Sequence, residues 1–168
     1  MVLWQTVSML EWCESEFGGD VRVRIVASQE GGRAIEFHPG SGAGERNDSN
    51  PLLREAVGQL TAYFAGGLRE FRLPLDIVGT EFQKRVWHEL LTIPYGEIRS
   101  YRQIAVAIAA PQAVRAVGAA NGANPIAIVV PCHRVIGSSG KLTGYGGGLP
   151  LKKRLLDLEG CNMLLFRS

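Results

Sequence analysis

The segment Pro131-Cys132-His133-Arg134 combines residue types that can carry out nucleophilic chemistry. A cysteine reacts as its thiolate, so it needs a nearby base or positive charge. His133 is a candidate base, and Arg134 adds local positive potential. The apolar run before Pro131 indicates an extended chain, on which adjacent side chains point in opposite directions. Proton transfer from Cys132 to His133 then needs a bend in the chain or a bridging water.

A histidine that acts as a base usually needs an acid that orients its ring. Glu159, at the end of a C-terminal helical segment, is the candidate for this role. Asn124 either sets a turn with Pro125 or fixes the backbone near Cys132. Chemistry alone leaves two alternatives open. Cys132 could be a small buried hydrophobic residue, or it could serve with His133 in a cysteine hydrolase.

Residues 112–121 predict a helix whose surface consists mostly of small side chains. Small residues let a helix approach another surface closely, either a neighbouring helix or a DNA groove. The only long cation in this helix is Arg115. It is an ordinary solvated arginine in the first case, and contacts phosphate or enters the base stack in the second. The small residues in and beside the helix are Ala113, Ala116, Gly118, Ala119, Ala120 and Gly122.

Two tyrosines stand out from the usual pattern of core aromatics. Tyr101 begins the preceding helix and is either a packing residue or a contact to a ligand. Tyr145 lies among glycines, where it has little core to join. An aromatic side chain on a Gly-rich loop is suited to stacking on a planar ligand.

The first half of the sequence predicts a small sheet and one helix. Alternation of apolar and polar side chains indicates strands. We expect strands at residues 20–28, 33–37 and 8–14, and a short strand with a linker at 73–78. The Gly-rich residues 38–50 predict a loop. Pro51, capped by Asn50, begins a helix that ends near Gly66.

The second half predicts mainly helices. Thr80 and Ser100 are N-cap residues, and each precedes a stripe of apolar residues with helical spacing. The helix after Ser100 and the helix at residues 112–121 are short and closely joined, which is the outline of a helix-turn-helix. Other expected elements are a buried strand-like run at 126–130, a Gly-rich hairpin or wing at 137–148, and a helix at 151–158.

Composition and charge narrow the function classes. The chain has 168 residues, 46% of them apolar, with a net charge of +2, which is typical of a soluble globular protein. Residues 1–79 carry 7 Lys or Arg and 11 Asp or Glu, whereas residues 80–168 carry 11 and 5. A basic second half suits phosphate binding, although scattered solvated charge gives the same count.

The cysteines and the apolar runs indicate the compartment. Three widely separated cysteines, Cys13, Cys132 and Cys161, support neither a disulfide framework nor a structural zinc site. No apolar stretch reaches the roughly 20 residues of a membrane span, and no secretory signal is evident at the N-terminus. These features predict a cytoplasmic protein with no metal site and no membrane association.

The segment around Cys132 resembles the active site of the O6-alkylguanine-DNA alkyltransferases. The resemblance extends from about Thr80 through Gly160. Its motifs are Asn124-Pro125, residues 128–136 with Pro-Cys-His-Arg-Val, residues 96–105, Arg115-Ala116-Val117-Gly118, Ser138-Ser139-Gly140, Gly144-Tyr145 and Gly147-Gly148-Leu149. The N-terminal region fits the family only loosely.

The resemblance implies a two-domain fold. Residues 1–79 would form an N-terminal α/β domain with a ribonuclease-H-like sheet. Residues 80–168 would form a mainly α domain of the winged-helix, helix-turn-helix type. It also implies direct-reversal DNA repair, in which a damaged guanine is flipped out of double-stranded DNA and its alkyl group is transferred irreversibly to Cys132. No cofactor is needed, and a monomer is expected. Repair of O4-alkylthymine is left open.

The resemblance also implies roles for individual residues. Cys132 accepts the alkyl group, His133 deprotonates it through a water, Glu159 polarises His133, and Asn124 steadies the active-site turn. The guanine pocket is lined by the backbone of Val135, Tyr145 and Gly146, and Tyr101 packs on the flipped base and supplies a proton. Contacts to DNA are expected from Tyr101, Arg102, Ala113, Arg115, Gly118, Arg134 and Ser138.

Two departures from the family pattern are relevant. Gly146 replaces a residue that carries a hydroxyl in some relatives, so that backbone N–H groups are the donors to guanine O6 there. The zinc ligands that some relatives carry near the N-terminus are not evident. Some relatives bind alkylated DNA without repairing it and recruit other repair factors. They typically carry tryptophan at the acceptor position, and Cys132 argues against that alternative.

Overall fold

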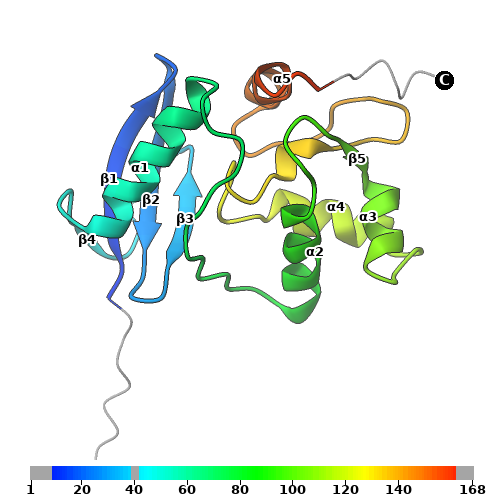
Figure 1. The fold of residues 1–168 in the computed structure, drawn as a ribbon. Helices are drawn as coiled ribbons and strands as arrows, with labels where there is room; N and C mark the ends of the chain where they lie inside the picture. The colour runs from blue at the N-terminus through cyan, green and yellow to red at the C-terminus, as the bar shows by residue number, and fades with distance from the viewer. Residues whose placement is uncertain (1–8, 39–41, 162–168) are drawn as a thin grey trace, which may run out of the picture.

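The first half of the chain forms a four-stranded sheet covered by one helix (Figure 1). The computed structural model describes residues 9–38 and 42–161. Strands lie in the order β3-β2-β1-β4, with β1 antiparallel to β2, β2 antiparallel to β3 and β4 parallel to β1. Their bounds are β1 (Glu11–Phe17), β2 (Val21–Ala27), β3 (Gly32–Glu36) and β4 (Glu45–Arg46).

The strands predicted at residues 20–28 and 33–37 are confirmed by β2 and β3. The third strand, expected at residues 8–14, begins later and continues to Phe17, because residues 14–16 pair with β2 in a regular antiparallel ladder. Pairing with a neighbour determines the limits of a strand more strongly than intrinsic propensity does. The two-residue strand β4 lies in the segment that we expected to be a loop.

Residues 73–78 form a linker, and the short strand predicted there is wrong. An isolated bridge joins Leu75 to Gly32. The Pro74 carbonyl accepts from the Gly32 N–H at 2.9 Å, but Pro74 has no N–H of its own with which to extend a ladder. The linker therefore follows the edge of the sheet and leads into the second half.

Helix α1 (Pro51–Phe64) begins and ends as predicted and lies over one face of the sheet (Figure 1). The Asn50 side chain accepts from the backbone N–H groups of Leu52 and Leu53, and Pro51 occupies the first turn, where no N–H is needed. The buried face consists of Leu53, Ala56, Leu60 and Tyr63. Tyr63 lies in the last turn, so the end of this helix reaches the second half of the chain.

The second half is mainly helical, as predicted. Its helices are α2 (Glu81–Leu91), α3 (Tyr101–Ala107), α4 (Val114–Gly122) and α5 (Leu149–Leu158). Thr80 and Ser100 form capping boxes with Gln83 and Gln103, in which each cap side chain and the third helical side chain exchange hydrogen bonds with the backbone. Helix α4 starts two residues later than expected, since Ala113 is its N-cap.

Helices α3 and α4 pack against each other and on α2, which is the predicted helix-turn-helix arrangement (Figure 1). The Trp87 indole on α2 donates to the Ala120 carbonyl of α4 at 2.8 Å and fixes the two helices together. Between α3 and α4 the chain turns at Ala109, which has a φ of +56°. One side of α4 remains uncovered by the described part of the chain.

Two strand predictions in the second half are wrong. Residues 126–130 form turns with two isolated bridges, Ile35 to Ile126 and Ala127 to Val130, because Ile128 has a φ of +73° that breaks an extended run. Residues 137–148 contain no strand pair and so no hairpin wing. The pairing found instead is a two-residue parallel contact between β5 (Arg99–Ser100) and β6 (Val135–Ile136).

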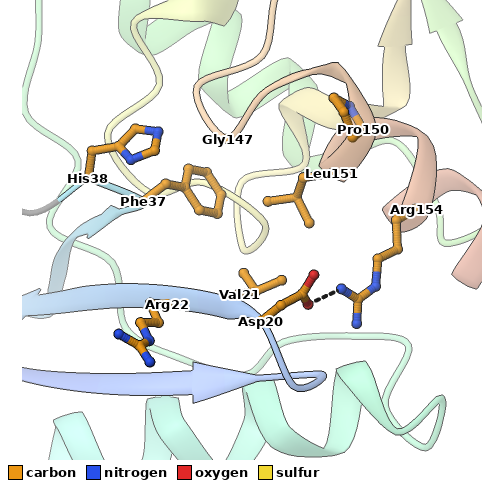
Figure 2. A pocket seen from close by; sticks show the side chains of 9 residues that line it. All are labelled: Asp20, Val21, Arg22, Phe37, His38, Gly147, Pro150, Leu151 and Arg154. Carbon is orange, nitrogen blue, oxygen red and sulfur yellow. Dashed lines mark hydrogen bonds and ion pairs between the residues drawn. The ribbon is translucent and has the colours of Figure 1, made fainter.

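One continuous core joins the two halves. A single cluster of buried apolar residues runs from the sheet and α1 through α2, α3 and α4 to α5. The two halves are also joined by an ion pair between Asp20, in the β1–β2 turn, and Arg154, on α5 (Figure 2). Phe37, at the end of β3, points toward Leu151 and the Gly-rich loop before α5 (Figure 2). The sheet domain therefore contacts the segment that holds Tyr145.

Candidate active site

Cys132 lies in a single 3-10 turn, η1 (Cys132–Arg134), and the extended conformation that we expected for this segment is wrong. Pro131 has a ψ of 61°, and its carbonyl accepts from the Arg134 N–H at 3.0 Å. This hydrogen bond closes the turn, so the side chains of Cys132 and His133 are not forced to opposite sides. The turn thus removes the geometric obstacle that an extended chain would impose on proton transfer between them.

The Cys132 thiol is almost buried, with 5% of the residue exposed. Burial raises its pKa, while a hydrogen bond with Asn124 and the charge of Lys152 act in the opposite direction. The direction of the shift indicates that the resting group is a neutral thiol. A neutral thiol needs a base before it can act as a nucleophile.

Glu159, the C-cap of α5, is the hub of a buried hydrogen-bond network. Its Oε1 accepts from Tyr63 Oη at 2.6 Å and lies 2.7 Å from His133 Nε2, and its Oε2 accepts from Arg134 Nε at 2.8 Å. The Gly96 N–H also approaches Oε2, at 3.3 Å. Burial alone would raise the pKa of Glu159, but the hydrogen bonds and charges of His133 and Arg134 hold it at about 2. Glu159 is therefore an ionised carboxylate.

His133 is completely buried, and burial lowers its pKa despite the neighbouring carboxylate. An ionised carboxylate only accepts hydrogen bonds, so the Nε2 atom that faces Glu159 must carry the proton. Nδ1 is then the basic nitrogen, and it has no hydrogen-bond partner among the described residues. The ring is thus neutral, oriented from one side and able to accept a proton on the other.

Arg134 does not lie where the expected DNA contact requires. It is 6% exposed, donates to both oxygens of Glu159, and donates from Nη1 to the Ile93 carbonyl at 2.6 Å. A buried carboxylate needs a counter-charge, and Arg134 supplies it. The assignment of Arg134 to DNA binding is therefore corrected to an internal ion pair.

Asn124 holds the turn before Cys132 from both sides. Its side chain donates to the Val130 carbonyl at 2.8 Å and accepts from the Ile126 N–H at 3.0 Å. These bonds fix residues 126–130 in their bent path. Asn121, on α4, donates to the Cys132 carbonyl at 3.4 Å. The cysteine is therefore tied directly to the small-residue helix.

A cavity of about 250 Å³ opens beside Cys132. Its wall includes Asn124, Tyr145, Gly146 and, from the sheet domain, Phe37. The rings of Phe37 and Tyr145 lie 5.5 Å apart, and the buried Tyr145 hydroxyl has no hydrogen-bond partner among the described residues. This is a partly open space with aromatic and glycine residues and a thiol in its wall, which is suited to a flat ring.

A groove of about 610 Å³ runs along the uncovered side of α4. It is lined by Tyr101, Arg115, Gly118 and the loop that holds Tyr145. The groove and the Cys132 cavity share four lining residues: Gly122, Gly144, Tyr145 and Gly146. The cavity and the groove therefore adjoin each other at Gly122 and at the loop that holds Tyr145.

Two of the small residues of α4, Gly118 and Gly122, are not required by internal packing. A Cβ atom added at Gly118 would meet only Tyr101, at 3.9 Å, and one added at Gly122 would meet nothing within 4 Å. Close approach to a neighbouring helix would leave less room than this. Arg115 is exposed on the same helix, Arg102 is exposed on α3, Ala113 is half-buried, and Ser138 is exposed in the loop after β6. All four side chains are therefore at least partly accessible to solvent.

Lys152 and Tyr63 belong to the site although sequence reasoning did not single them out. Lys152 is fully buried on α5, and its Nζ donates to the carbonyls of Val135, at 2.6 Å, and Thr143, at 3.0 Å. Burial lowers its pKa to about 8. Val135 itself is buried, and its carbonyl is occupied by Lys152. The spacing of apolar residues does not predict a buried lysine, and Tyr63 fits the pattern of an ordinary core residue of α1.

Two further properties concern metals and membranes. Within residues 9–38 and 42–161, no three His, Cys, Asp or Glu side chains gather closely enough to hold a metal ion. The helices found in the same residues are all too short or too polar to span a bilayer.

Two family models match almost the whole of the described chain. The DNA-binding domain of 6-O-methylguanine DNA methyltransferase matches residues 81–161, and the ribonuclease-like domain of the same family matches residues 9–77. The expected architecture, a small ribonuclease-like α/β sheet followed by a helical DNA-binding half, is thereby confirmed.

Individual relatives carry the same family name. The methylated-DNA–protein-cysteine methyltransferase of Mycobacterium bovis is 70% identical over 104 residues, which are 62% of this chain and 63% of that protein. That of Methanosarcina acetivorans is 52% identical over 142 residues, which are 82% of this chain and 91% of that protein. Among solved structures, Mycobacterium tuberculosis OGT in complex with DNA has a TM-score of 0.80 and 46% identity, with coverage of 95% of this chain and 99% of that one.

Proposed function

Because the chain belongs to the 6-O-methylguanine DNA methyltransferase family, we propose that it repairs DNA by moving an alkyl group from guanine O6 to its own Cys132. One observation carries this proposal: the cavity beside Cys132 shares its wall with the groove along α4. A base flipped out of DNA that lies against α4 would enter the cavity beside Cys132 where the two hollows adjoin, at Gly122 and the loop that holds Tyr145. The damaged DNA is double-stranded, and the base is flipped before reaction.

The chemical step is a displacement at the alkyl carbon. His133 Nδ1 takes the proton of the Cys132 thiol through a bridging water, and the thiolate attacks the methyl carbon. An S–C bond forms as the C–O6 bond breaks, and the electron pair of that bond stays on the guanine. Tyr101 donates a proton to the guanine ring, so that the restored guanine stays in the DNA as a neutral base. The proton held by His133 then returns to Tyr101 through solvent. The thioether is stable, so each molecule reacts once and no cofactor takes part.

The outer face around α4 is the proposed DNA contact. Helix α4 enters the minor groove, and Arg115 fills the gap left by the flipped base. Tyr101 packs on that base, and the Arg102 and Ser138 side chains contact phosphates. Ala113 and Gly118 leave room for the DNA backbone. This assignment is supported by the exposure of Arg115 and by the free space above Gly118.

The base-binding pocket is proposed from the walls of the cavity. Tyr145 stacks on the guanine, and backbone N–H groups near Gly146 contact its edge. Val135 is not among the residues that line this cavity, and its N–H is bonded to the Cys132 carbonyl. We also propose a monomer that acts in the cytoplasm, with a domain boundary between residues 79 and 80. The boundary is supported by the two family models, which end at residue 77 and begin at residue 81.

Stoichiometry tests this proposal. Radiolabelled O6-methylguanine DNA in excess is mixed with the protein, and the label in the protein fraction is counted over time. We expect the count to stop at one methyl group per protein molecule. Label that never leaves the DNA contradicts the proposal, as does label released in repeated turnovers.

Gly118→Ala should separate DNA binding from internal packing. Alanine in the middle of α4 should stabilise the fold by about 0.5–1 kcal/mol, because glycine loses more conformational freedom on folding. DNA affinity should fall several-fold, since the added methyl group occupies space that the DNA backbone needs. Thermal unfolding and fluorescence anisotropy with duplex DNA measure the two effects. Gain of stability with unchanged affinity would exclude α4 from the interface.

Arg115→Ala should slow methyl transfer by about ten- to a hundredfold while the fold stays intact, because a side chain that replaces the flipped base contributes about 1.5–3 kcal/mol. Single-turnover kinetics on O6-methylguanine duplex measures the change. Arg72→Ala is the matched control, as Arg72 is exposed in the sheet half. Equal rates in the two variants would contradict the role of Arg115.

A further inference from the structure

Tyr63 links the sheet domain to the proposed active site. It lies in the last turn of α1 and is completely buried. Its ring is held by three aromatic neighbours, with centroids 5.5 Å from Phe64, 5.3 Å from Phe71 and 6.2 Å from Tyr95. From this position its hydroxyl donates to Glu159 Oε1 at 2.6 Å and lies 3.5 Å from His133 Nε2.

The direction of this hydrogen bond is fixed by the charges. Glu159 is ionised, and burial raises the pKa of Tyr63 far above its ordinary value, so the proton stays on the tyrosine. Oε1 therefore receives three donors, from Tyr63, His133 and Arg134 Nη2, the last at 3.0 Å. The position of Oε1 in turn determines the direction of the His133 Nε2–H bond, and hence where Nδ1 points.

We propose that Tyr63 is a positioning residue of the alkyl-transfer site, through which the sheet domain sets the orientation and proton affinity of His133. The inference rests on the proposed function, because His133 matters as a base only if Cys132 must be deprotonated. Tyr63 acts through Glu159 and touches neither the substrate nor the thiol.

The hydroxyl should affect the pH dependence of the reaction. By donating to Oε1, Tyr63 withdraws part of the negative charge that would otherwise stabilise a protonated His133. Without this donor the carboxylate favours the imidazolium more strongly, so His133 becomes protonated at higher pH and can no longer accept the thiol proton. The ionisable groups that surround His133 are Lys152 from α5 and Glu159 at its C-cap, Arg134 and Cys132 from η1, Tyr63 from α1, and Tyr145 from the loop before α5.

Tyr63→Phe tests the inference, because it removes the hydroxyl and keeps the buried ring. We expect the single-turnover rate of methyl transfer at pH 7 to fall about tenfold, the usual range for one charge-assisted hydrogen bond. We also expect the acid limb of the pH–rate profile to move to higher pH, so that part of the rate returns under alkaline conditions. A purely structural defect would lower the rate equally at every pH.

Tyr95→Phe is the matched control. Its hydroxyl donates to the Leu158 backbone carbonyl at 3.0 Å, so it holds the same helix end without touching the carboxylate. This variant should keep the wild-type acid limb. If Tyr63→Phe keeps both rate and profile, or if both variants lose rate equally at all pH values, the inference is wrong. Wild-type protein that transfers no methyl group contradicts the proposed function instead.

A measurement on the wild-type protein covers the case in which Tyr63→Phe does not fold. Nitrogen-detected NMR of the three histidines should show His133 as the neutral Nε2–H tautomer. The Tyr63 hydroxyl proton should appear as a slowly exchanging signal with contacts to its own ring protons. A rapidly exchanging hydroxyl, or a proton on Nδ1, contradicts the inference.

Discussion

Cys132→Ala should reduce methyl transfer below detection and leave recognition of the lesion intact. The sulfur is the atom that forms the new bond, and no other described thiol lines the cavity. Affinity should persist because the groove along α4 and the pocket wall are unchanged, and alanine fills most of the volume of a residue that is only 5% exposed. Transfer of labelled methyl groups and anisotropy with O6-methylguanine duplex measure the two properties.

Cys161→Ala is the control for this variant. Cys161 is partly exposed after α5, and burial raises the pKa of its thiol to about 11. The Cys161→Ala protein should therefore transfer methyl groups at the wild-type rate. Residual label in the Cys132→Ala protein would show that another nucleophile accepts the group. Loss of lesion binding together with transfer would indicate that the variant is misfolded, which thermal unfolding detects.

Glu159→Gln should have the second largest effect, on stability and on rate together. The amide leaves the buried Arg134 without its counter-charge, and loss of one partner of a buried ion pair costs about 3–5 kcal/mol. The same amide is uncharged and no longer orients the His133 ring. The rate should fall, because a general base contributes a factor of about 10²–10⁴. Denaturant unfolding and single-turnover kinetics measure these losses. Asp157→Asn, at an exposed carboxylate two residues away on α5, should change neither.

The lowered pKa of Glu159 predicts how the free energy of unfolding depends on pH. Its pKa is about 2 in the folded protein and about 4.3 in an unfolded chain. Because its pKa is lower in the folded protein, Glu159 stabilises the fold by about 3 kcal/mol at pH values above the pKa of the unfolded chain. This contribution disappears as the pH falls from about 4.5 toward 2. Acid unfolding should therefore be steep in this window for the wild type and shallower for Glu159→Gln. Parallel curves would contradict the network.

Local patterns predicted most of the secondary structure. Asn50, Thr80 and Ser100 each cap a helix as their residue types indicate. The alternation located β2 and β3, although both faces of β2 are buried from Val23 to Ala27. The strand predictions failed where tertiary contacts decide the conformation. Residues 126–130 are apolar enough for a strand, but the two hydrogen bonds of the Asn124 side chain and the positive φ of Ile128 keep them bent.

The site was predictable only in part for a related reason. The site residues that the sequence indicated have reactive or polar side chains, which suggest chemistry by their type: Cys132, His133, Glu159 and Asn124. Arg134 has an equally suggestive type, yet its burial follows from Glu159, a residue 25 positions away. Tyr63 and Lys152 look like ordinary helix positions, and their contacts arise only when α1 and α5 meet around η1. Spacing along the chain does not encode such contacts.

Intact-mass and peptide mass spectrometry after reaction with O6-methylguanine DNA identify the residue that accepts the alkyl group. The folded protein should gain the mass of one methyl group in place of a hydrogen, and the peptide containing Cys132 should carry it while the DNA is restored to guanine. An unmodified Cys132 in folded protein that has bound the lesion, or a methyl group located on Cys13 or Cys161, would contradict transfer to Cys132.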